Sequence, residues 1–293
     1  MEKMWYNHLN IQIFQEGLFS MFYQKFQLWD KYPEATLTAY VCDKEPKLSP
    51  RPAVIVCPGG GYSGLAPREA EPVVRHFFGK GMNCYLLHYS VGENAKDHAP
   101  LIQAALAIKT VRERAEEDNT DPKKIYILGF SAGGHLAASA GVFWNLPVVR
   151  DAVGVTDGTA PEGINRPDGM VLCYPVITMG EFTHKGTSQN VSGHEILTEE
   201  DILHFSIEKN VDPTTPPTFI WHTFTDSTVP VQNTIMMTAA LAEAKVPFEC
   251  HIFPEGPHGL ALCNEETAEG TQRLLVPHAE CWAELAVKWI KDF

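Results

Sequence analysis

After Arg51, short runs of β-branched and aromatic residues alternate with longer amphipathic stretches, and this alternation constrains the fold more than any other feature of the sequence. Strands joined by crossover helices have this pattern, so it predicts an α/β domain with a mainly parallel central sheet. Because the predicted strands are apolar at successive positions, helices should cover both faces of the sheet. The expected strands are residues 53–57, 83–89, 124–129, 170–174, 218–223 and 249–253, and the expected helices are residues 68–79, 101–117, 134–142, 198–208, 231–244 and 271–293.

Two β-like runs precede this series within residues 19–41, and Asp30, Pro33 and Glu34 separate them. They predict an antiparallel hairpin at the edge of the same sheet. The sequence contains no internal repeat, low-complexity segment or linker, so we expect residues 1–293 to form a single domain.

Two stretches between the predicted elements lack any periodic pattern. Residues 145–168 are rich in Gly, Pro and Asp, and residues 178–195 are rich in Gly, Ser, Asn and His. Long irregular segments in a compact domain are often binding loops or lids, and we expect these two to be irregular.

The chain is acidic, since 23 Lys and Arg stand against 36 Asp and Glu and give a formal net charge of -13. Such a charge repels the phosphates of nucleic acids and anionic lipid surfaces, so neither is expected as a partner. The apolar runs, such as residues 54–57, are far shorter than the roughly 18 residues that cross a bilayer. We therefore expect no membrane span.

The cysteines and the first residues of the chain both bear on its location. The seven cysteines are scattered, with no C-x-x-C motif, and several fall within predicted strands, which is typical of reduced, buried thiols. The first ten residues contain no basic segment leading into an apolar one, so no secretory signal is expected. Together these features predict a cytoplasmic protein.

The most specific motif is G-F-S-A-G, Gly129 to Gly133, between the apolar run K-I-Y-I-L and the helix-forming run G-H-L-A-A-S-A. A serine at the apex of a strand-turn-helix is held in a strained conformation, and the two flanking glycines leave space where a Cβ would collide. This context predicts that Ser131 is a nucleophile. The alternative is an ordinary Gly-Ser turn.

A serine hydroxyl needs a base to become nucleophilic, and the base needs a carboxylate to orient it. Asp226 follows the predicted strand T-F-I-W-H-T, and His258 follows the strand E-C-H-I-F on a loop with flanking glycine. The order Ser, Asp, His, each after a strand, predicts Ser131, Asp226 and His258 as a catalytic triad. Taken singly, Asp226 could cap a helix and His258 could be an ordinary histidine.

Three other carboxylates are weaker candidates for the orienting acid. They are Asp157, Asp168 and Glu255.

The run C-P-G-G-G-Y, Cys57 to Tyr62, directly follows the predicted strand A-V-I-V. Backbone N–H groups in a glycine loop can reach the oxyanion of a tetrahedral intermediate without obstruction by side chains. We expect Gly60 and Gly61, with Ala132 after the nucleophile, to form the oxyanion hole. A phosphate cradle is the competing interpretation, but the phosphate-loop motifs are missing.

Tyr62, next to the proposed hole, is a candidate for the wall of the acyl pocket, with simple packing as the alternative.

The remaining polar residues favour structural roles. Arg68, Glu69 and Glu71 open a predicted helix and suggest a structural ion pair. Trp221 and His222 lie on a predicted strand and are expected in the core. Three further histidines, His184, His194 and His204, do not have zinc-ligand spacing, so no metal and no cofactor is expected.

Several motifs together resemble those of the α/β-hydrolase fold carbohydrate esterases, and more narrowly the bacterial acetyl esterases and acetylxylan esterase-like proteins. They are P-G-G-G-Y, R-E-A-E-P, Y-S-V, G-F-S-A-G-G-H, C-Y-P-V-I, P-P-T-F-I-W-H-T with D-x-x-V-P, and H-I-F-P-E-G-x-H-G-L. The resemblance runs from about Arg51 to the C-terminus. It implies a serine esterase that removes acetyl groups from sugars or xylo-oligosaccharides, with Ser131, Asp226 and His258 as its triad. Two positions depart from the pattern: Pro58 stands where related hydrolases often have histidine, and Thr225 where many have a second acid.

The expected function is therefore hydrolysis of short acyl esters of small acetylated sugars, with imported oligosaccharides as the natural substrate. An amidase or peptidase of the same fold, such as an arylformamidase or a prolyl-oligopeptidase-type enzyme, is an alternative. A non-catalytic binding protein that kept the fold is another. The sequence permits a homo-oligomer and does not determine one.

Overall fold

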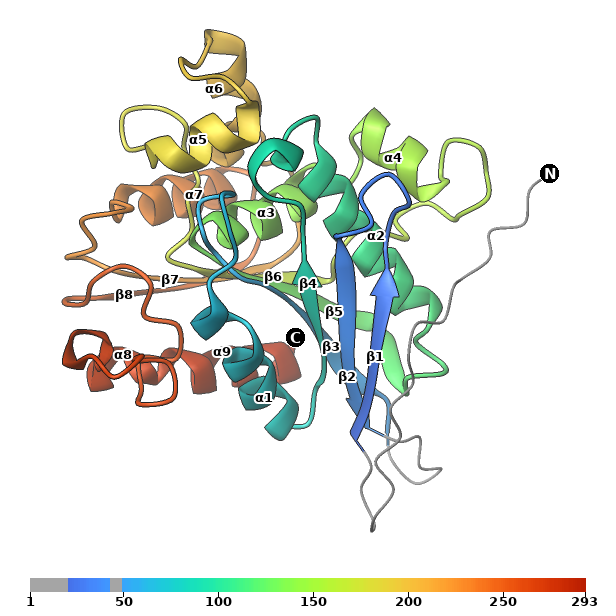
Figure 1. The fold of residues 1–293 in the computed structure, drawn as a ribbon, viewed down its shortest axis with the longest axis horizontal. Helices are drawn as coiled ribbons and strands as arrows, with labels where there is room; N and C mark the ends of the chain where they lie inside the picture. Colours follow the sequence, from blue (N-terminus) through green and yellow to red (C-terminus); the bar gives the residue numbers. More distant parts are fainter. Residues whose placement is uncertain (1–20, 43–48) are drawn as a thin grey trace.

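A twisted sheet of eight strands forms the centre of the computed structural model, which describes residues 21–42 and 49–293 (Figure 1). Every neighbouring pair from β4 to β8 is parallel, and only the β1–β2 and β2–β4 pairs are antiparallel. In order across the sheet, the strands are β1 (Met21–Gln27), β2 (Thr36–Cys42), β4 (Asn83–His88), β3 (Arg51–Cys57), β5 (Thr120–Phe130), β6 (Gly169–Cys173), β7 (Thr218–Thr223) and β8 (Phe248–Phe253). The predicted α/β class and mainly parallel sheet are confirmed.

The predicted antiparallel hairpin is also present: β1 and β2 form it, at one edge of the sheet. Tyr23 lies opposite Tyr40 across this pair, and their rings meet edge to face at 5.5 Å. Residues 19 and 20 of the predicted hairpin, and the first ten residues considered for a signal, lie outside the described residues.

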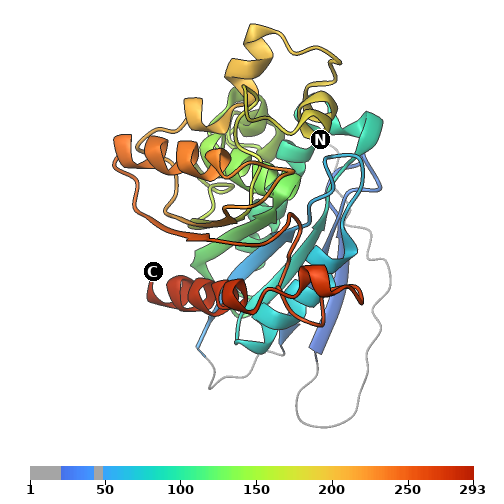
Figure 2. The same ribbon diagram turned by 90° about the vertical axis from the view of Figure 1, so that its left-hand side faces the viewer.

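Helices cover both faces of the sheet, as Figures 1 and 2 show. On one face lie α1 (Glu71–Gly79), α8 (Pro277–Glu280) and α9 (Trp282–Asp292). On the other lie α2 (Ala99–Glu113), α3 (Ser131–Val142), α4 (Pro147–Val153) and α7 (Gln232–Glu243). Each layer buries its own apolar cluster against the sheet.

Large aromatic side chains fill the cluster beneath α1 and α9. Trp221 of β7 stacks on Trp282 of α9 with ring centroids 5.0 Å apart, and Phe130 meets Trp282 edge to face. Burial of each such side chain stabilises the fold by about 1.5–3 kcal/mol relative to exposure. Helices α1 and α9 are far apart in the sequence but lie side by side over this cluster (Figures 1 and 2). A salt bridge of 2.5 Å between Lys80 and Glu284 also joins them.

The two stretches expected to be irregular each contain a short helix, so that expectation is wrong in part. They are α4 in residues 145–168 and α5 (Lys185–Ser192) in residues 178–195. Helices of two turns are too short to show a clear apolar period, and their stability comes from caps and packing. The side chain of His184 caps α5 by accepting a hydrogen bond from the Thr187 N–H at 3.3 Å.

Several predicted helices are divided in the structure. Proline or a backbone change at a junction separates η1 (Pro67–Glu69) from α1, and η4 (Gln272–Leu274) from α8 and α9. The predicted helix 198–208 is divided into α6 (Glu199–Phe205) and η3 (Ile207–Lys209), and one further turn, η2 (Gly92–Ala95), was not predicted.

The carboxyl ends of β3, β5, β7 and β8 meet at one edge of the sheet, because these strands are parallel. The helices α5 and α6 lie beyond this edge (Figure 1). Within residues 21–42 and 49–293, no helix is long and apolar enough to cross a membrane.

Candidate active site

Ser131 lies at the sharp turn between β5 and α3, in a left-handed backbone conformation with φ of 53°. A Cβ at Gly129 would collide with the carbonyl of Gly133, and a Cβ at Gly133 would collide with the carbonyls of Cys57 and Pro58. Only glycine fits both positions, and this explains why the motif needs both. The turn is strained, and the packing of β5 and α3 around it holds Ser131 in place.

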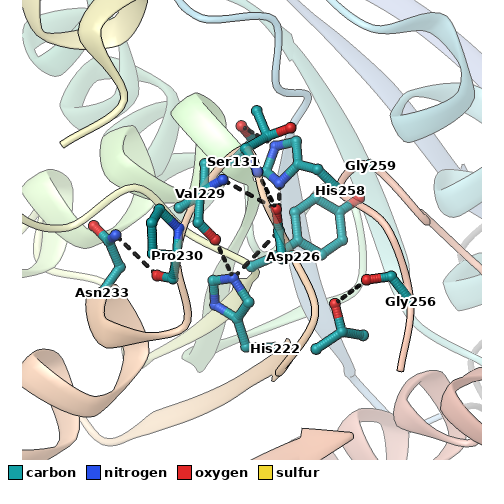
Figure 3. Close-up of polar contacts among 12 residues, drawn as sticks. Ser131, His222, Asp226, Val229, Pro230, Asn233, Gly256, His258 and Gly259 are labelled. Carbon is teal, nitrogen blue, oxygen red and sulfur yellow. Dashed lines mark hydrogen bonds and ion pairs between the residues drawn. The ribbon is translucent and has the colours of Figure 1, made fainter. Parts of the chain in front are cut away.

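The structure brings together the three residues predicted for the triad (Figure 3). The Oγ of Ser131 lies 2.8 Å from the Nε2 of His258, and the Nδ1 of His258 lies 2.6 Å from the Oδ2 of Asp226. A carboxylate oxygen only accepts hydrogen bonds, so Nδ1 of His258 carries the proton. Its Nε2 is then free to accept the proton of the Ser131 hydroxyl.

Asp226 is held by more donors than His258 alone. Its Oδ1 accepts hydrogen bonds from the N–H groups of Thr228 at 2.9 Å and Val229 at 3.0 Å. Burial of this carboxyl acts to raise its pKa, but the hydrogen bonds from His222 and His258 outweigh that effect and hold the pKa of Asp226 below its ordinary value. Asp226 thus caps the following turn with Oδ1 and contacts His258 with Oδ2.

His222 contacts the predicted acid, which the sequence analysis did not anticipate. It lies on β7 and is fully buried, as expected of a core residue. Its Nε2 donates to the carbonyl of Val229 at 2.9 Å and lies 3.3 Å from the Oδ2 of Asp226, and its Nδ1 lies 2.8 Å from the Oγ1 of Thr234 (Figure 3). The only signal in the sequence is a histidine in an apolar strand four residues before the acid.

The glycine loop after β3 runs beside Ser131. A Cβ at Gly59 would lie 3.0 Å from the Cβ of Ser131, so the backbone of the loop comes this close only because it is glycine. Gly60 has φ of 130°, and a Cβ there would collide with the carbonyl of Gly64. The loop therefore depends on glycine both for its path and for its distance from the serine.

Three N–H groups near Ser131 are available as donors. Ala132 is the second residue of α3, so its N–H has no acceptor within the helix. Within the part of the chain that the structure describes, the N–H groups of Gly60 and Gly61 donate to no other residue. The role of these three groups as an oxyanion hole stays a prediction.

Tyr62 is only 1% exposed, and its hydroxyl lies 3.0 Å from the Nδ1 of His135. Its ring packs edge to face on Tyr89 at 5.7 Å. These contacts favour the packing interpretation of Tyr62, while direct substrate contact stays a prediction.

The weaker acid candidates lie in other surroundings. Asp168 precedes β6, at the opposite edge of the sheet from Ser131, and pairs with Arg112 at 2.7 Å. Asp157 accepts hydrogen bonds from the N–H and the hydroxyl of Thr159. Among the described residues, neither these two nor Glu255 bonds to His258, whereas Asp226 does.

The prediction that Glu69 takes part in an ion pair is wrong. Arg68 pairs instead with Glu269 at 3.0 Å and donates to the carbonyl of Gly259, next to His258, at 2.8 Å. Glu69 is 2% exposed, and no ion pair among residues 21–42 and 49–293 includes it. Its carboxylate accepts from the N–H of Gly59 at 2.7 Å and from the hydroxyl of Tyr174 at 2.8 Å.

Helix α5 and its N-cap residue contact the glycine loop at Gly61. The side-chain amide of Asn190 donates to the carbonyl of Gly61 at 2.8 Å, and the ring of His184 lies 3.7 Å from where a Cβ of Gly61 would be. Burial, and then the nearby His258, lower the pKa of His184. A neutral imidazole and polar side chains thus lie beside the loop.

The other two histidines that were considered lie away from the triad contacts. His194 bonds to Asp201 at 2.8 Å, and the ring of His204 stacks on Phe143 at 5.5 Å. In the described part of the chain, no group of three or more His, Cys, Asp or Glu side chains is arranged to hold a metal ion.

Chemically, the arrangement is suited to nucleophilic acyl transfer. Ser131 has a base within hydrogen-bond distance, and the base has an ionised partner.

Comparison with known proteins agrees with this chemistry. The BD-FAE family matches residues 40–241. The endo-1,4-beta-xylanase B of Butyrivibrio fibrisolvens is 37% identical over 242 residues, which are 80% of this chain and 36% of that protein. The acetylxylan esterase of Xylanibacter ruminicola is 29% identical over 215 residues, 72% of this chain and 41% of that protein. The chain thus spans less than half the length of these two relatives.

Among solved structures, the acetyl ester-xyloside bifunctional hydrolase from Caldicellulosiruptor lactoaceticus is similar with a TM-score of 0.74 and 36% identity. The similarity covers 88% of each chain.

Proposed function

Because the chain belongs to the BD-FAE family and has the α/β-hydrolase fold, we propose that it is a serine carboxylesterase that removes acetyl groups from xylo-oligosaccharides or related sugars. One observation carries the proposal: the hydrogen-bonded series Ser131, His258 and Asp226 beside a glycine loop with free N–H groups. Such a site can cleave both peptides and esters. We propose an acetyl ester as the substrate because of the functions of the relatives.

In the acylation step, Ser131 Oγ forms a bond to the carbonyl carbon of the ester as its proton passes to Nε2 of His258. The carbonyl oxygen becomes an oxyanion, and the N–H groups of Gly60, Gly61 and Ala132 stabilise it. The bond to the sugar oxygen then breaks, and His258 returns the proton to that oxygen. Asp226 stabilises the imidazolium throughout, because its carboxylate remains ionised.

In the deacylation step, water takes the place of the sugar. His258 accepts a proton from the water as its oxygen attacks the acetyl carbon on Ser131. The second tetrahedral intermediate collapses as His258 returns its proton to Ser131 Oγ, and the product leaves as acetic acid, which loses its proton to the solvent. The free enzyme is regenerated without a cofactor.

The functions of the relatives support the substrate class. One is an acetylxylan esterase and a solved structure is an acetyl ester-xyloside hydrolase. Near the glycine loop this chain offers the polar side chains of His184 and Asn190, which suit the hydroxyl groups of a sugar. An acetylated oligosaccharide is therefore the partner that we propose.

The test compares acetyl, butyryl and octanoyl aryl esters with acetylated xylo-oligosaccharides, using the unmodified protein and Ser131→Ala. We expect kcat/KM for acetyl to exceed that for octanoyl by at least roughly tenfold, or about 1.4 kcal/mol. Ser131→Ala should lose nearly all turnover, with a remainder of about 10³ to 10⁴ over water. Release of acetate from the oligosaccharides should be faster than from polymeric xylan.

Other outcomes would replace the proposal. Faster octanoyl hydrolysis indicates a lipase, and activity confined to N-formyl or prolyl substrates indicates the amidase or peptidase alternative. Binding of acetylated sugars without turnover indicates a non-catalytic protein, and unchanged turnover in Ser131→Ala removes the triad.

A further inference from the structure

A buried carboxylate, that of Glu69, contacts the first residue of the glycine loop. Glu69 is 2% exposed, and the described residues provide it with hydrogen-bond donors and no ion pair. Removal of a carboxylate from water is costly unless hydrogen bonds compensate, so a buried one needs a reason. The catalytic steps above do not use it.

The two oxygens of Glu69 accept from two different parts of the site. Oε2 takes the N–H of Gly59 at 2.7 Å, which fixes the first peptide group of the glycine loop. Oε1 takes the hydroxyl of Tyr174 at 2.8 Å. Both oxygens act as acceptors, and an ionised carboxylate does this without a proton of its own.

Tyr174 extends this network to the loop that carries the base. Its hydroxyl accepts the N–H of Ala261 at 2.9 Å, three residues after His258, and its ring packs edge to face on the His258 ring at 5.0 Å. Burial, and then the charge of Glu69, raise the pKa of Tyr174 well above its ordinary value, so the hydroxyl keeps its proton and donates to Glu69. One carboxylate thus connects the loop at Gly59 with the loop of the base.

Hydrogen bonds hold the shape of the glycine loop: the carbonyl of Gly59 accepts from the N–H of Ala66 at 2.9 Å, and the carbonyl of Gly60 accepts from the N–H of Ser63 at 3.0 Å. Its residues have no side chains to pack, and glycine has more backbone freedom than any other residue. Pro58 takes the position where related hydrolases often have a histidine, and in this chain its carbonyl is held by the hydroxyl of Tyr89 at 2.6 Å. The N–H of the next residue is held by Glu69, so these two contacts fix the entry to the loop.

We propose that Glu69 is a positioning residue for the oxyanion hole: it fixes the Gly59 peptide group, so that the N–H groups of Gly60 and Gly61 are aimed at the oxyanion. The proposal rests on the ester hydrolysis proposed above. Oxyanion stabilisation depends on donors set in advance at the correct distance, and small displacements lose much of it. Loss of Glu69 should therefore affect the transition state far more than substrate binding.

The test is Glu69→Gln in the full chain, assayed with an aryl acetate. The amide has one acceptor oxygen where the carboxylate has two, so either Gly59 or Tyr174 loses its partner. We expect kcat to fall by about 10- to 100-fold with KM within about twofold of the unmodified protein.

A pair of inhibitors separates positioning from general damage to the pocket. A trifluoromethyl ketone adds to Ser131 and places an oxyanion in the hole, whereas the corresponding alcohol binds the same pocket without forming an adduct. For Glu69→Gln we expect the inhibition constant of the ketone to rise in step with the loss of kcat, and that of the alcohol to stay unchanged. Equal weakening of both inhibitors, or an unchanged kcat, would overturn the proposal.

Glu71→Gln is the matched control, since Glu71 has the same side chain two positions later and is exposed. It should leave kcat and both inhibition constants unchanged. If Glu69→Gln does not fold, Tyr174→Phe takes its place, because it removes the hydroxyl between Glu69 and Ala261 and keeps the ring on His258. We expect a smaller loss of kcat and the same split between ketone and alcohol, and no split would count against the role of Glu69.

The activity of the unmodified protein and of Ser131→Ala keeps this test separate from the proposed function. If the unmodified protein hydrolyses the acetate and Ser131→Ala does not, the esterase proposal stands whatever Glu69→Gln does.

Discussion

Four side chains form a connected series, from Ser131 through His258 to Asp226 by hydrogen bonds and on to His222 by a contact of 3.3 Å (Figure 3). Asp226 is its centre, since donors approach both of its oxygens. A carboxylate so placed keeps its charge near neutral pH, orients the imidazole and stabilises the imidazolium. In the mechanism that we propose, the reactivity of Ser131 thus depends on how firmly Asp226 is held.

At the residue scale, we predict that Asp226→Asn lowers kcat by about 10⁴-fold with a much smaller change in KM. An amide at this position favours the wrong tautomer of His258, so Nε2 can no longer accept the proton of Ser131. Steady-state kinetics with an aryl acetate would measure both constants.

Asp157→Asn is the control for this prediction, because Asp157 is an exposed carboxylate that the sequence also made a candidate. It should keep normal kcat. If Asp226→Asn were kinetically silent, the acid role would belong to another carboxylate.

At the scale of elements, His135 of α3 connects the glycine loop with the helices beyond the sheet. Its Nε2 donates to the carbonyl of Phe205, at the end of α6, at 2.9 Å, and its Nδ1 accepts from the hydroxyl of Tyr62 at 3.0 Å. Both contacts are made by the neutral ring. Burial lowers the pKa of His135 to about 4.

This shift predicts how stability depends on pH. Above the ordinary histidine pKa of about 6.5 the ring is neutral in both the folded and the unfolded chain, and its contribution is complete. Between pH 6.5 and pH 4 the unfolded chain binds a proton that the folded one does not, so the free energy of unfolding falls as pH falls. The loss from this group between pH 7 and pH 5 should be about 2 kcal/mol.

Urea unfolding at pH 7 and pH 5, followed by tryptophan fluorescence, would measure this dependence. His135→Gln should be less stable at pH 7 and should lose less on going to pH 5, since an amide does not titrate in this range. The exposed His278 provides the comparison, and His278→Gln should keep the slope of the unmodified protein. An equally steep slope in His135→Gln would contradict the assignment.

At the scale of the whole molecule, the two apolar clusters lie on opposite faces of one sheet and share its strands. Strands from the middle of the chain and the helix at its end complete the same core, as the contacts among Phe130 of β5, Trp221 of β7 and Trp282 of α9 show. Neither cluster can be exposed without loss of the sheet between them. We therefore retain the prediction that residues 1–293 form a single domain.

This prediction is checked by equilibrium unfolding with three probes: far-UV circular dichroism, tryptophan fluorescence and esterase activity. We expect a single transition with the same midpoint for the two spectroscopic probes. Trp282→Ala should lower the free energy of unfolding by about 3–5 kcal/mol without separating the two spectroscopic transitions. Two transitions at different denaturant concentrations would indicate separate domains.

The sequence by itself determined the elements whose signals are local. Buried strands appear as continuous apolar runs, and the turn at Ser131 requires glycine at position 129 for a steric reason that acts within a few residues. Chain order after each strand was enough to predict that Asp226 and His258 lie near Ser131, because the carboxyl ends of parallel strands meet at one edge. The helices α4 and α5 had no such signal, because helices of seven and eight residues depend on capping and packing.

Tertiary structure alone decided the partners of the buried polar groups. Glu69 and Tyr174 are 105 positions apart, and their contact exists because the order of strands in the sheet places both segments behind the same loop. His222 was predicted to be in the core and is, but its contact with Asp226 depends on how the chain turns after β7. A hydrophobic period specifies which side of an element is buried, and only the packing of elements far apart in the sequence specifies which groups meet there.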